Sequence, residues 1–187
     1  MKVKDILKLA LEFVGEKELC GKFEQESTES LNENEMKKLK VMLSCFNMVN
    51  QEIASDYLPF LTKENVDASN GGILFSSLSK RVVNIYEVKD RFGFNLKFRV
   101  ISNFVETKKS AKSVVYSFLP EEMSLEDEVE FFNGLSARVY AYGVASEVLL
   151  VSGLSGDAEI WEERYKESLF ILSRKRGEHR LPKRSWF

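Results

Sequence analysis

This sequence is poor in the residue types that carry out most enzyme chemistry. Its 187 residues include one histidine, His179, and two cysteines, Cys20 and Cys45, which lie far apart in the chain. Neither cysteine has a histidine nearby in the sequence, and the two thiols have neither the spacing of a metal site nor that of a redox pair. We therefore expect no enzymatic activity, no metal, no cofactor, and cysteines that stay reduced.

The sequence also lacks the glycine patterns of nucleotide-binding sites and the long apolar runs of membrane spans. Gly71 and Gly72 are not followed by the lysine of a phosphate-binding loop, and Gly153 and Gly156 lack the preceding strand of a dinucleotide site. No run approaches 18 consecutive apolar residues, and Met1–Val14 is interrupted by charges. We therefore predict neither a membrane span nor a signal peptide, and a protein that stays where it is made.

The charge of the chain is nearly balanced. It has 27 basic and 29 acidic residues, which give a net charge of −2. A broad nucleic-acid-binding surface needs an excess of basic side chains to neutralise phosphates, so bulk nucleic-acid binding is disfavoured. The 44% of hydrophobic and 12% of aromatic residues supply enough material for a core, and the length suits one domain.

Helical periodicity dominates the first third of the chain. Apolar residues at three- and four-residue spacing predict a helix over about 4–14, ended by Gly15, and a long helix over about 33–58, ended by Pro59. A polar residue, Asn50, interrupts the apolar stripe of the long helix. Such a residue typically fixes register or bonds to a neighbouring helix. The stripe consists of Met36, Leu39, Leu43, Phe46, Ile53 and Tyr57.

The last third is predicted to be a helical hairpin. Ser124 followed by the acidic residues 126–128 has the pattern of a helix start, so we expect a helix from there to about Val151. After a break at 152–156, Asp157 is expected to cap a second helix, and so short a loop predicts an antiparallel pair. Small residues at three- and four-residue spacing would let another helix approach the first one closely. They are Gly134, Ala137, Ala141 and Ala145.

The middle of the chain shows the alternation typical of strands. Strands are predicted at Val82–Lys89 and Val114–Phe118, with turns at 70–72 and 90–93. Strict alternation predicts one further strand, in which Phe94, Leu96, Phe98 and Val100 lie on one face. We expect a small antiparallel sheet of four or five strands. The predicted fold class is therefore α+β: a helical body, made of the long helix and the C-terminal helical hairpin, with a small antiparallel β insertion at about 60–118 in the middle of the chain.

The C-terminal tail, residues 179–187, is a candidate for binding another subunit. The local charge from Arg174 to Arg184 is about +5, and the chain ends in two aromatic residues. Aromatic residues and arginine anchor many interfaces. The alternatives for this tail are a frayed basic terminus and a segment that faces nucleic acid in a lumen. The portal- or partner-binding candidates are Lys175, Arg176, Arg180, Lys183, Arg184, Trp186 and Phe187.

The densest group of carboxylates precedes the helical hairpin. Its candidate residues are Glu121, Glu122, Glu126, Asp127 and Glu130. Two carboxylates four residues apart on a helix can in principle hold a hard cation, but no second acidic cluster with ordered spacing supports a metal here. We expect instead an acidic patch between subunits, which meets the basic tail of a neighbouring copy and steers assembly.

The order of these parts resembles the head-to-tail connector (adaptor) proteins of tailed phages, including the tail-tubular ring proteins. A long helix ending in Asn50–Tyr57 precedes a compact β insertion and the junction Tyr116–Glu122. An alanine-rich helix, the turn Gly156-Asp157 and an amphipathic helix follow. The resemblance covers roughly residues 33–176. It departs at 16–32, a polar and glutamate-rich segment that we expect to form a loop.

The resemblance implies a structural role without catalytic residues. Members of the family form a homo-oligomeric ring of about twelve copies beneath the portal. The ring binds portal and tail proteins and surrounds the channel through which DNA passes without sequence-specific contact. A C-terminal segment, here 175–187, often reaches into the portal. The location implied is the head–tail junction of the virion, and the host cytoplasm before assembly. Alternatives are a tail-completion or minor capsid protein, and a non-catalytic binding module using the aromatic face of Phe94–Val100.

Overall fold

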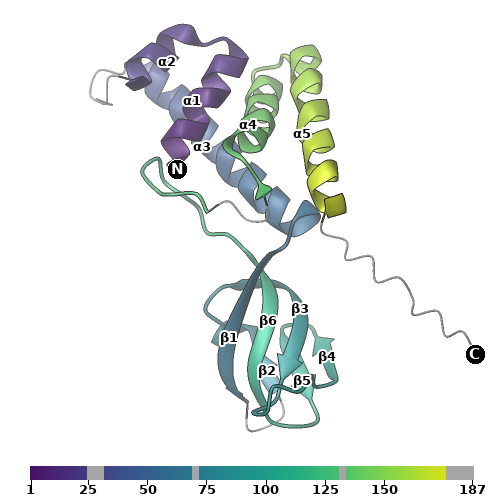
Figure 1. Ribbon diagram of the computed structural model, residues 1–187. Coiled ribbons are helices and arrows are strands. Elements are labelled where there is room, and N and C mark those ends of the chain that lie inside the picture. Colours follow the sequence, from purple (N-terminus) through teal and green to yellow (C-terminus); the bar gives the residue numbers. More distant parts are fainter. Residues whose placement is uncertain (25–31, 69–71, 131–133, 176–187) are drawn as a thin grey trace, which may run out of the picture.

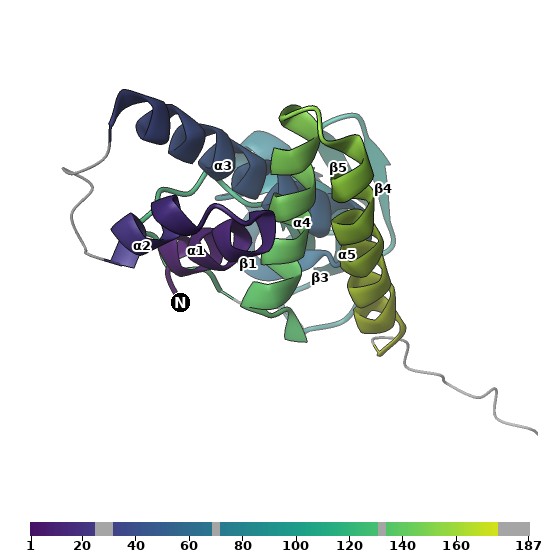
Figure 2. The ribbon, with the colours of Figure 1, turned by 90° about the horizontal axis from the view of Figure 1, so that it is seen from above.

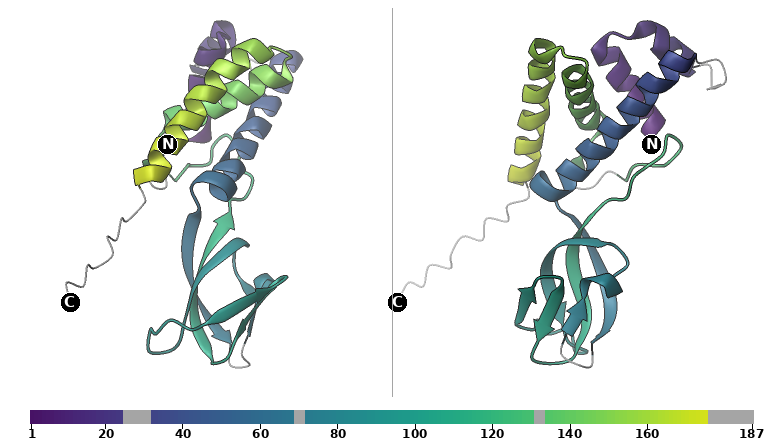
Figure 3. Two further views of the ribbon diagram at one scale, coloured as in Figure 1. Left: turned by 90° about the vertical axis from the view of Figure 1, so that its right-hand side faces the viewer. Right: turned by 180° about the vertical axis from the view of Figure 1, so that it is seen from behind.

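The computed structural model describes residues 1–24, 32–68, 72–130 and 134–175, and it consists of two bodies joined end to end (Figure 1). A helical body lies at one end and a β module, residues 60–119, lies at the other. Figure 3 shows the same separation from the side and from behind. The mixed architecture, with an antiparallel β insertion between helical segments, confirms the predicted α+β class and places the insertion almost where expected.

Within the described residues, the helical body is built from five α-helices. Two short N-terminal helices precede a long helix, which ends in one turn of π-helix, and an antiparallel hairpin completes the body. Their bounds are α1 Val3–Val14, α2 Lys17–Glu24, α3 Glu33–Glu52 with the π-turn η2 Ile53–Tyr57, α4 Ala137–Val151 and α5 Ser155–Lys175. Seen from above, α4 lies at the centre, with α1, α3 and α5 around it (Figure 2).

Helix α2 corrects the loop predicted over 16–32. The side chains of Leu19 and Cys20 in this helix are buried against the core. This burial stabilises a helix that its polar composition does not favour. Only residues up to Glu24 and from Asn32 onward are described, so the rest of the predicted loop lies outside the described residues.

The long helix is confirmed, and its start follows from local chemistry. The Asn32 side chain accepts a hydrogen bond from the Glu35 amide at 2.9 Å, and the Glu35 carboxylate accepts one from the Asn32 amide at 2.9 Å. This reciprocal pair satisfies two amide donors at the helix start. Asn50 is buried and accepts a hydrogen bond from the Tyr140 hydroxyl of α4 at 3.1 Å, as expected of a polar residue in the stripe. Met36, however, is exposed, because the helix extends past the core there.

The hairpin of α4 and α5 is confirmed, but its first helix begins at Ala137 and not near residue 126. Residues 121–130 instead form a non-helical segment with one turn, which runs beside the N-terminus. The amide of Val3 donates to the Asp127 carbonyl at 3.0 Å, and the amide of Val129 donates to the Met1 carbonyl at 2.9 Å. These bonds need a partner more than 120 residues away in the chain, so no local pattern indicates them. Helix α5 begins at Ser155, and Asp157 lies in its first turn.

The β module contains two antiparallel three-stranded sheets, where one sheet of four or five strands was expected. The first has the strand order β1-β6-β3 and the second β2-β5-β4. The bounds are β1 Phe60–Ala68, β2 Gly72–Leu74, β3 Arg81–Lys89, β4 Phe98–Ile101, β5 Phe104–Thr107 and β6 Ala111–Leu119, with a 3₁₀ turn, η3, at Phe75–Ser77. Splitting the strands between two sheets lets the inner faces of both bury one small core.

The predicted strand face at 94–100 is wrong in part. The strand is shorter, spanning Phe98–Ile101, and Phe94 before it is 70% exposed. Leu96 and Phe98 do pack against the core, whereas Val100 is 46% exposed on an edge strand. Alternation identified a β region, but an edge strand has one side without a neighbour, so its outward side chains remain in solvent.

Candidate binding surfaces

The potential metal ligands of the described residues are not gathered into a site, and the two thiols are buried. In the ranges described, no group of three or more histidine, cysteine, aspartate or glutamate side chains could hold a metal ion. Both cysteines are buried free thiols, and burial raises the pKa of Cys45 to about 11. This thiol is therefore protonated at neutral pH and is a poor nucleophile. His179 lies outside the described residues.

Across those same ranges, no helix combines the length and the apolar character needed to span a bilayer.

The five carboxylates of the predicted acidic patch divide into two groups. Glu126 forms an ion pair of 2.6 Å with Lys2, which lowers the pKa of the Glu126 carboxyl, and Asp127 accepts a hydrogen bond of 2.6 Å from the Ser124 amide. These two side chains are occupied within the chain, holding the N-terminus and a turn. Glu121, Glu122 and Glu130 are exposed and remain candidates for contact with another molecule.

Only the first of the predicted tail residues is within the described chain. Lys175 is the last residue of α5, which ends beside the junction of the two bodies (Figure 1). The other candidates lie outside the described residues, so docking by the tail stays a prediction. They are Arg176, Arg180, Lys183, Arg184, Trp186 and Phe187.

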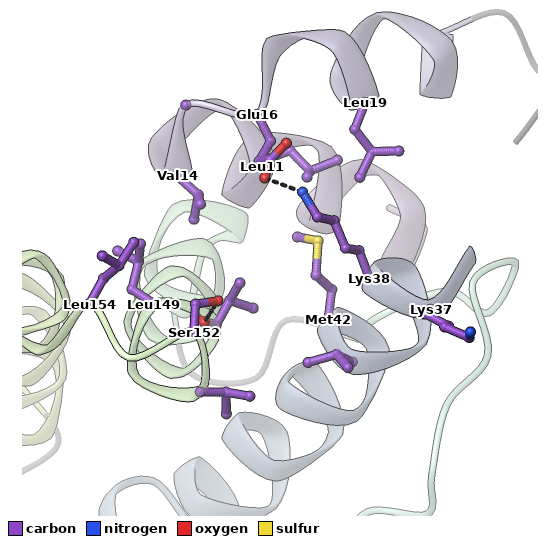
Figure 4. Close-up of a pocket in the computed structure, with 14 residues that line it drawn as sticks. Leu11, Val14, Glu16, Leu19, Lys37, Lys38, Met42, Leu149, Ser152 and Leu154 are labelled. Carbon is purple, nitrogen blue, oxygen red and sulfur yellow. Dashed lines mark hydrogen bonds and ion pairs between the residues drawn. The ribbon is translucent and has the colours of Figure 1, made fainter. Parts of the chain in front are cut away.

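An apolar hollow lies at the end of the helical body farthest from the β module (Figure 4). It has a volume of about 590 Å³. Helices α1, α3 and α4, the start of α2 and the turn after α4 form its walls. Leu11, Leu19, Met42 and Leu149 line its floor as part of the buried core. Val41 is 41%, Val151 65% and Leu154 51% exposed at its margin.

A single ion pair crosses this groove. Lys38 of α3 reaches Glu16 at 2.5 Å, and it links the turn between α1 and α2 to the long helix (Figure 4). Lys37, the other charge on the wall, pairs at 2.9 Å with Glu33 on its own helix. Most of the lining is aliphatic and few polar groups face the hollow. The groove therefore suits apolar side chains of a partner better than a reacting substrate.

A second candidate surface is the turn that follows β3. The Asp90 carboxylate accepts hydrogen bonds from the amides of Phe92 at 2.8 Å and Phe94 at 3.0 Å, and Gly93 adopts the left-handed conformation with φ of 83°. Phe92 and Phe94 are 67% and 70% exposed, and Arg91 stacks on the Phe92 ring with its guanidinium carbon 4.5 Å from the ring centre. Two aromatics and an arginine held in one rigid turn have the composition of an interface anchor.

The two bodies carry opposite charge. Residues 60–119 contain ten lysines and arginines and five carboxylates. Residues 1–59 and 120–175 together contain 13 lysines and arginines and 23 carboxylates. In the β module the carboxylates of Asp67 and Glu87 are paired with Lys112 and Lys89, and Glu64 accepts hydrogen bonds from Ser79 and Tyr116. The surface of the module is therefore basic, although the chain as a whole is nearly neutral.

The groove was not predicted from the sequence, and the turn was predicted only as a turn and not as a binding surface, although signals for both surfaces are present. Val148–Val151 is a run of four apolar residues in a helix, and four consecutive helical residues cannot all face one core. Phe92 and Phe94 flank a glycine in a predicted turn, where large apolar side chains have no strand face to cover them. Both patterns indicate apolar side chains that are left for a partner.

A half-buried carboxylate at the end of α3 gives a pH-dependent prediction. Desolvation raises the pKa of Glu52, partly offset by a hydrogen bond of 3.2 Å that the Tyr165 hydroxyl donates to it. The folded state therefore holds this proton more tightly than the unfolded state. Above the pKa of the folded state, the buried charge lowers the free energy of unfolding. This loss of stability disappears as the pH falls through that pKa. Glu52→Gln should stabilise the fold at pH 7.5 by less than about 1 kcal/mol, because water screens the group, and should give no gain at acid pH.

Thermal unfolding of the two proteins between pH 4 and pH 8 measures this difference. Glu121→Gln, at an exposed position in the segment after β6, is the matched control and should follow the wild type at every pH. A stability gain for Glu52→Gln that grew toward acid pH would show that the sign is wrong.

No protein-family model matches the chain, and no curated protein matches it by sequence.

Proposed function

We propose that this chain is a structural subunit of the head-to-tail connector of a tailed phage, and that it acts without catalysis. About twelve copies would form a ring between portal and tail, around the channel through which DNA passes without sequence-specific contact. The protein would enter the virion at the head–tail junction from the host cytoplasm. The resemblance in the order of its parts supports this role.

The structural observation that carries the proposal is the presence of two candidate binding surfaces at opposite ends of the molecule. The apolar groove lies at the far end of the helical body, and the turn Asp90–Phe94 lies in the β module, at the end of β3 away from the junction. A protein that holds two different neighbours at once needs two such separate surfaces. Binding of this kind gains its free energy by removing apolar surface from water, at about 25 cal/mol per Å².

The direct test is assembly with the cognate portal. The purified chain is mixed with portal rings, and the mixture is examined by native mass spectrometry and electron microscopy. A symmetric ring of this chain, seated on the portal, is the expected result. A chain that remains monomeric beside the portal would refute the connector role, and binding to tail proteins in place of the portal would favour a tail-completion protein.

Deleting Ser185–Phe187 tests the role of the tail. We expect the melting temperature to stay unchanged and portal affinity to fall by at least about tenfold, because two aromatic anchors are lost. Fluorescence anisotropy against the portal measures the affinity, and Ser185→Ala is the control. An equal loss of thermal stability would show that Trp186 and Phe187 belong to the core.

A further inference from the structure

The outward face of α5 is covered by no other part of the described chain. Its buried side is formed by Ala158, Tyr165 and Leu169. The opposite side carries Glu159, Glu163 and Glu167, which are exposed, four residues apart, and without an ion pair among the described residues. On the same side Ile160, Phe170 and Ile171 are 54%, 55% and 49% exposed.

Such a face is unfavourable when it is left in water. Like charges four residues apart on a helix repel one another, and three large apolar side chains beside them are solvated. A partner that brings positive charge and apolar surface together would relieve both effects. Within the chain, Arg174 stacks on the Phe170 ring with its guanidinium carbon 4.4 Å from the ring centre, and Lys166 pairs with Glu162 on the flank of the helix. Neither cation forms an ion pair with the three glutamates of the outward face.

The β module carries a surface with the complementary character. Arg91 on the turn and Lys97 just after it are exposed and have no ion pair in the described part of the chain, and Phe92 and Phe94 supply the apolar surface. A hollow beside the turn is lined by three further cations, Lys63, Lys89 and Lys112, of which Lys89 is paired with Glu87 and Lys112 with Asp67. Because Asp90 already fixes the turn, little conformational entropy is lost when it binds.

The turn cannot reach the α5 of its own chain. Arg81, at the start of β3, pairs with Leu119 next to the helical body, whereas Lys89 pairs with Ser113 at the far end of the sheet. Nine residues of strand, at about 3.3 Å each, separate the two ends. The two complementary surfaces therefore lie apart within one molecule and are available to a second one.

We propose that the turn Asp90–Phe94 of one copy docks on the outward face of α5 of a second copy. The phenylalanines would pack against Ile160, Phe170 and Ile171, and Arg91 and Lys97 would face the row of glutamates. This contact joins two different surfaces, so a bound pair still presents one free surface of each kind, and further copies can add until a ring closes. The inference rests on the proposed function in that it names the contact between neighbouring subunits.

Sedimentation of the full-length chain over a range of concentrations tests this contact. We expect self-association with a Kd in the micromolar range or weaker, and weakening at high salt because exposed charges take part. Arg91→Glu and Glu163→Arg should each reduce the association constant at least tenfold, and the two together should recover part of the loss. The double variant Phe92→Ala/Phe94→Ala should remove association while leaving the melting temperature unchanged.

Two charge reversals serve as controls. Arg81→Glu changes an exposed cation at the other end of β3, and Glu18→Lys changes an exposed carboxylate of α2 that belongs to none of the candidate surfaces. Neither should alter association. Equal loss in the controls, or no association in low salt at the highest attainable concentration, would overturn the contact. Salt-sensitive oligonucleotide binding that Arg91→Glu abolishes, in a chain that does not self-associate, would assign the turn to nucleic acid instead.

Disulfide trapping distinguishes this contact from a symmetric one. Asn95→Cys and Ile171→Cys chains are oxidised alone and as a mixture, with the native thiols protected by burial. The contact predicts a linked dimer in the mixture and little in either chain alone; linkage mainly between two Asn95→Cys chains would overturn it. A ring that forms on the portal without this crosslink would leave the connector role intact and refute only the contact.

Discussion

Replacing Gly143 with valine should lower the free energy of unfolding by about 3 kcal/mol. Gly143 lies in α4 where this helix passes between α3 and α5. A β-carbon at this position would lie 2.9 Å from the Val49 Cγ1 atom and 3.0 Å from the Tyr165 Cε2 atom. Both neighbours are buried side chains in a packed interior, so they cannot move aside without disturbing their own contacts. Chemical denaturation monitored by circular dichroism measures the loss.

Gly156→Val is the matched control for this experiment. Gly156 lies in the first turn of α5, and a β-carbon there has no atom within 4 Å. We expect a change of less than about 0.5 kcal/mol, because only helix propensity is affected. If Gly143→Val and Gly156→Val had the same unfolding midpoint, α4 would not lie this close to both of its neighbours.

Replacing Phe60 with alanine should cost about 3–5 kcal/mol, the largest effect that we expect from a single truncation. Phe60 is the first residue of β1 and is only 2% exposed. Its ring contacts Phe118 of β6 with ring centres 6.2 Å apart, and it lines the junction together with Asn50 and Met123 of the helical body. Loss of the ring leaves a cavity at the point where the two bodies meet.

The neighbouring residue supplies the control for Phe60. Leu61 points to the opposite face of the same strand and is 47% exposed, so Leu61→Ala should cost less than about 1 kcal/mol. Limited proteolysis of Phe60→Ala should also show faster cleavage near the junction, at residues 120–123, than in the wild type. If both variants lost the same small amount of stability, the junction would not be a packed part of the core.

Local sequence patterns were sufficient for those features whose hydrogen bonds and backbone conformation depend only on nearby residues. The reciprocal hydrogen bonds of Asn32 and Glu35, the glycine that ends α1, and the proline after the long helix are all decided within a few residues. The β insertion, expected at about 60–118, was found at 60–119 for the same reason, since strand alternation and flanking prolines are local signals.

The binding surfaces were less accessible to this reasoning. Residues predicted from charge density alone were divided by the fold: Glu126 and Asp127 are occupied within the chain, whereas Glu121, Glu122 and Glu130 remain exposed. The charge difference between the two bodies is a property of the sequence, but it becomes visible only when the β module is known as a separate unit. The glutamates and the exposed apolar side chains on the outward face of α5 can be recognised only when it is known which side of that helix faces the core.

The sequence by itself therefore determined the class of the fold, the positions of most helices and strands, and the scarcity of groups suited to bond-making chemistry. The tertiary structure alone decided that residues 121–130 extend along the N-terminus, that the strands form two sheets, and which apolar side chains remain in solvent. The physical reason is the range of the interactions. Capping, alternation and helical periodicity act over a few residues, whereas burial and β-pairing depend on groups distant in sequence, such as Val3 and Asp127, which the folded chain brings together.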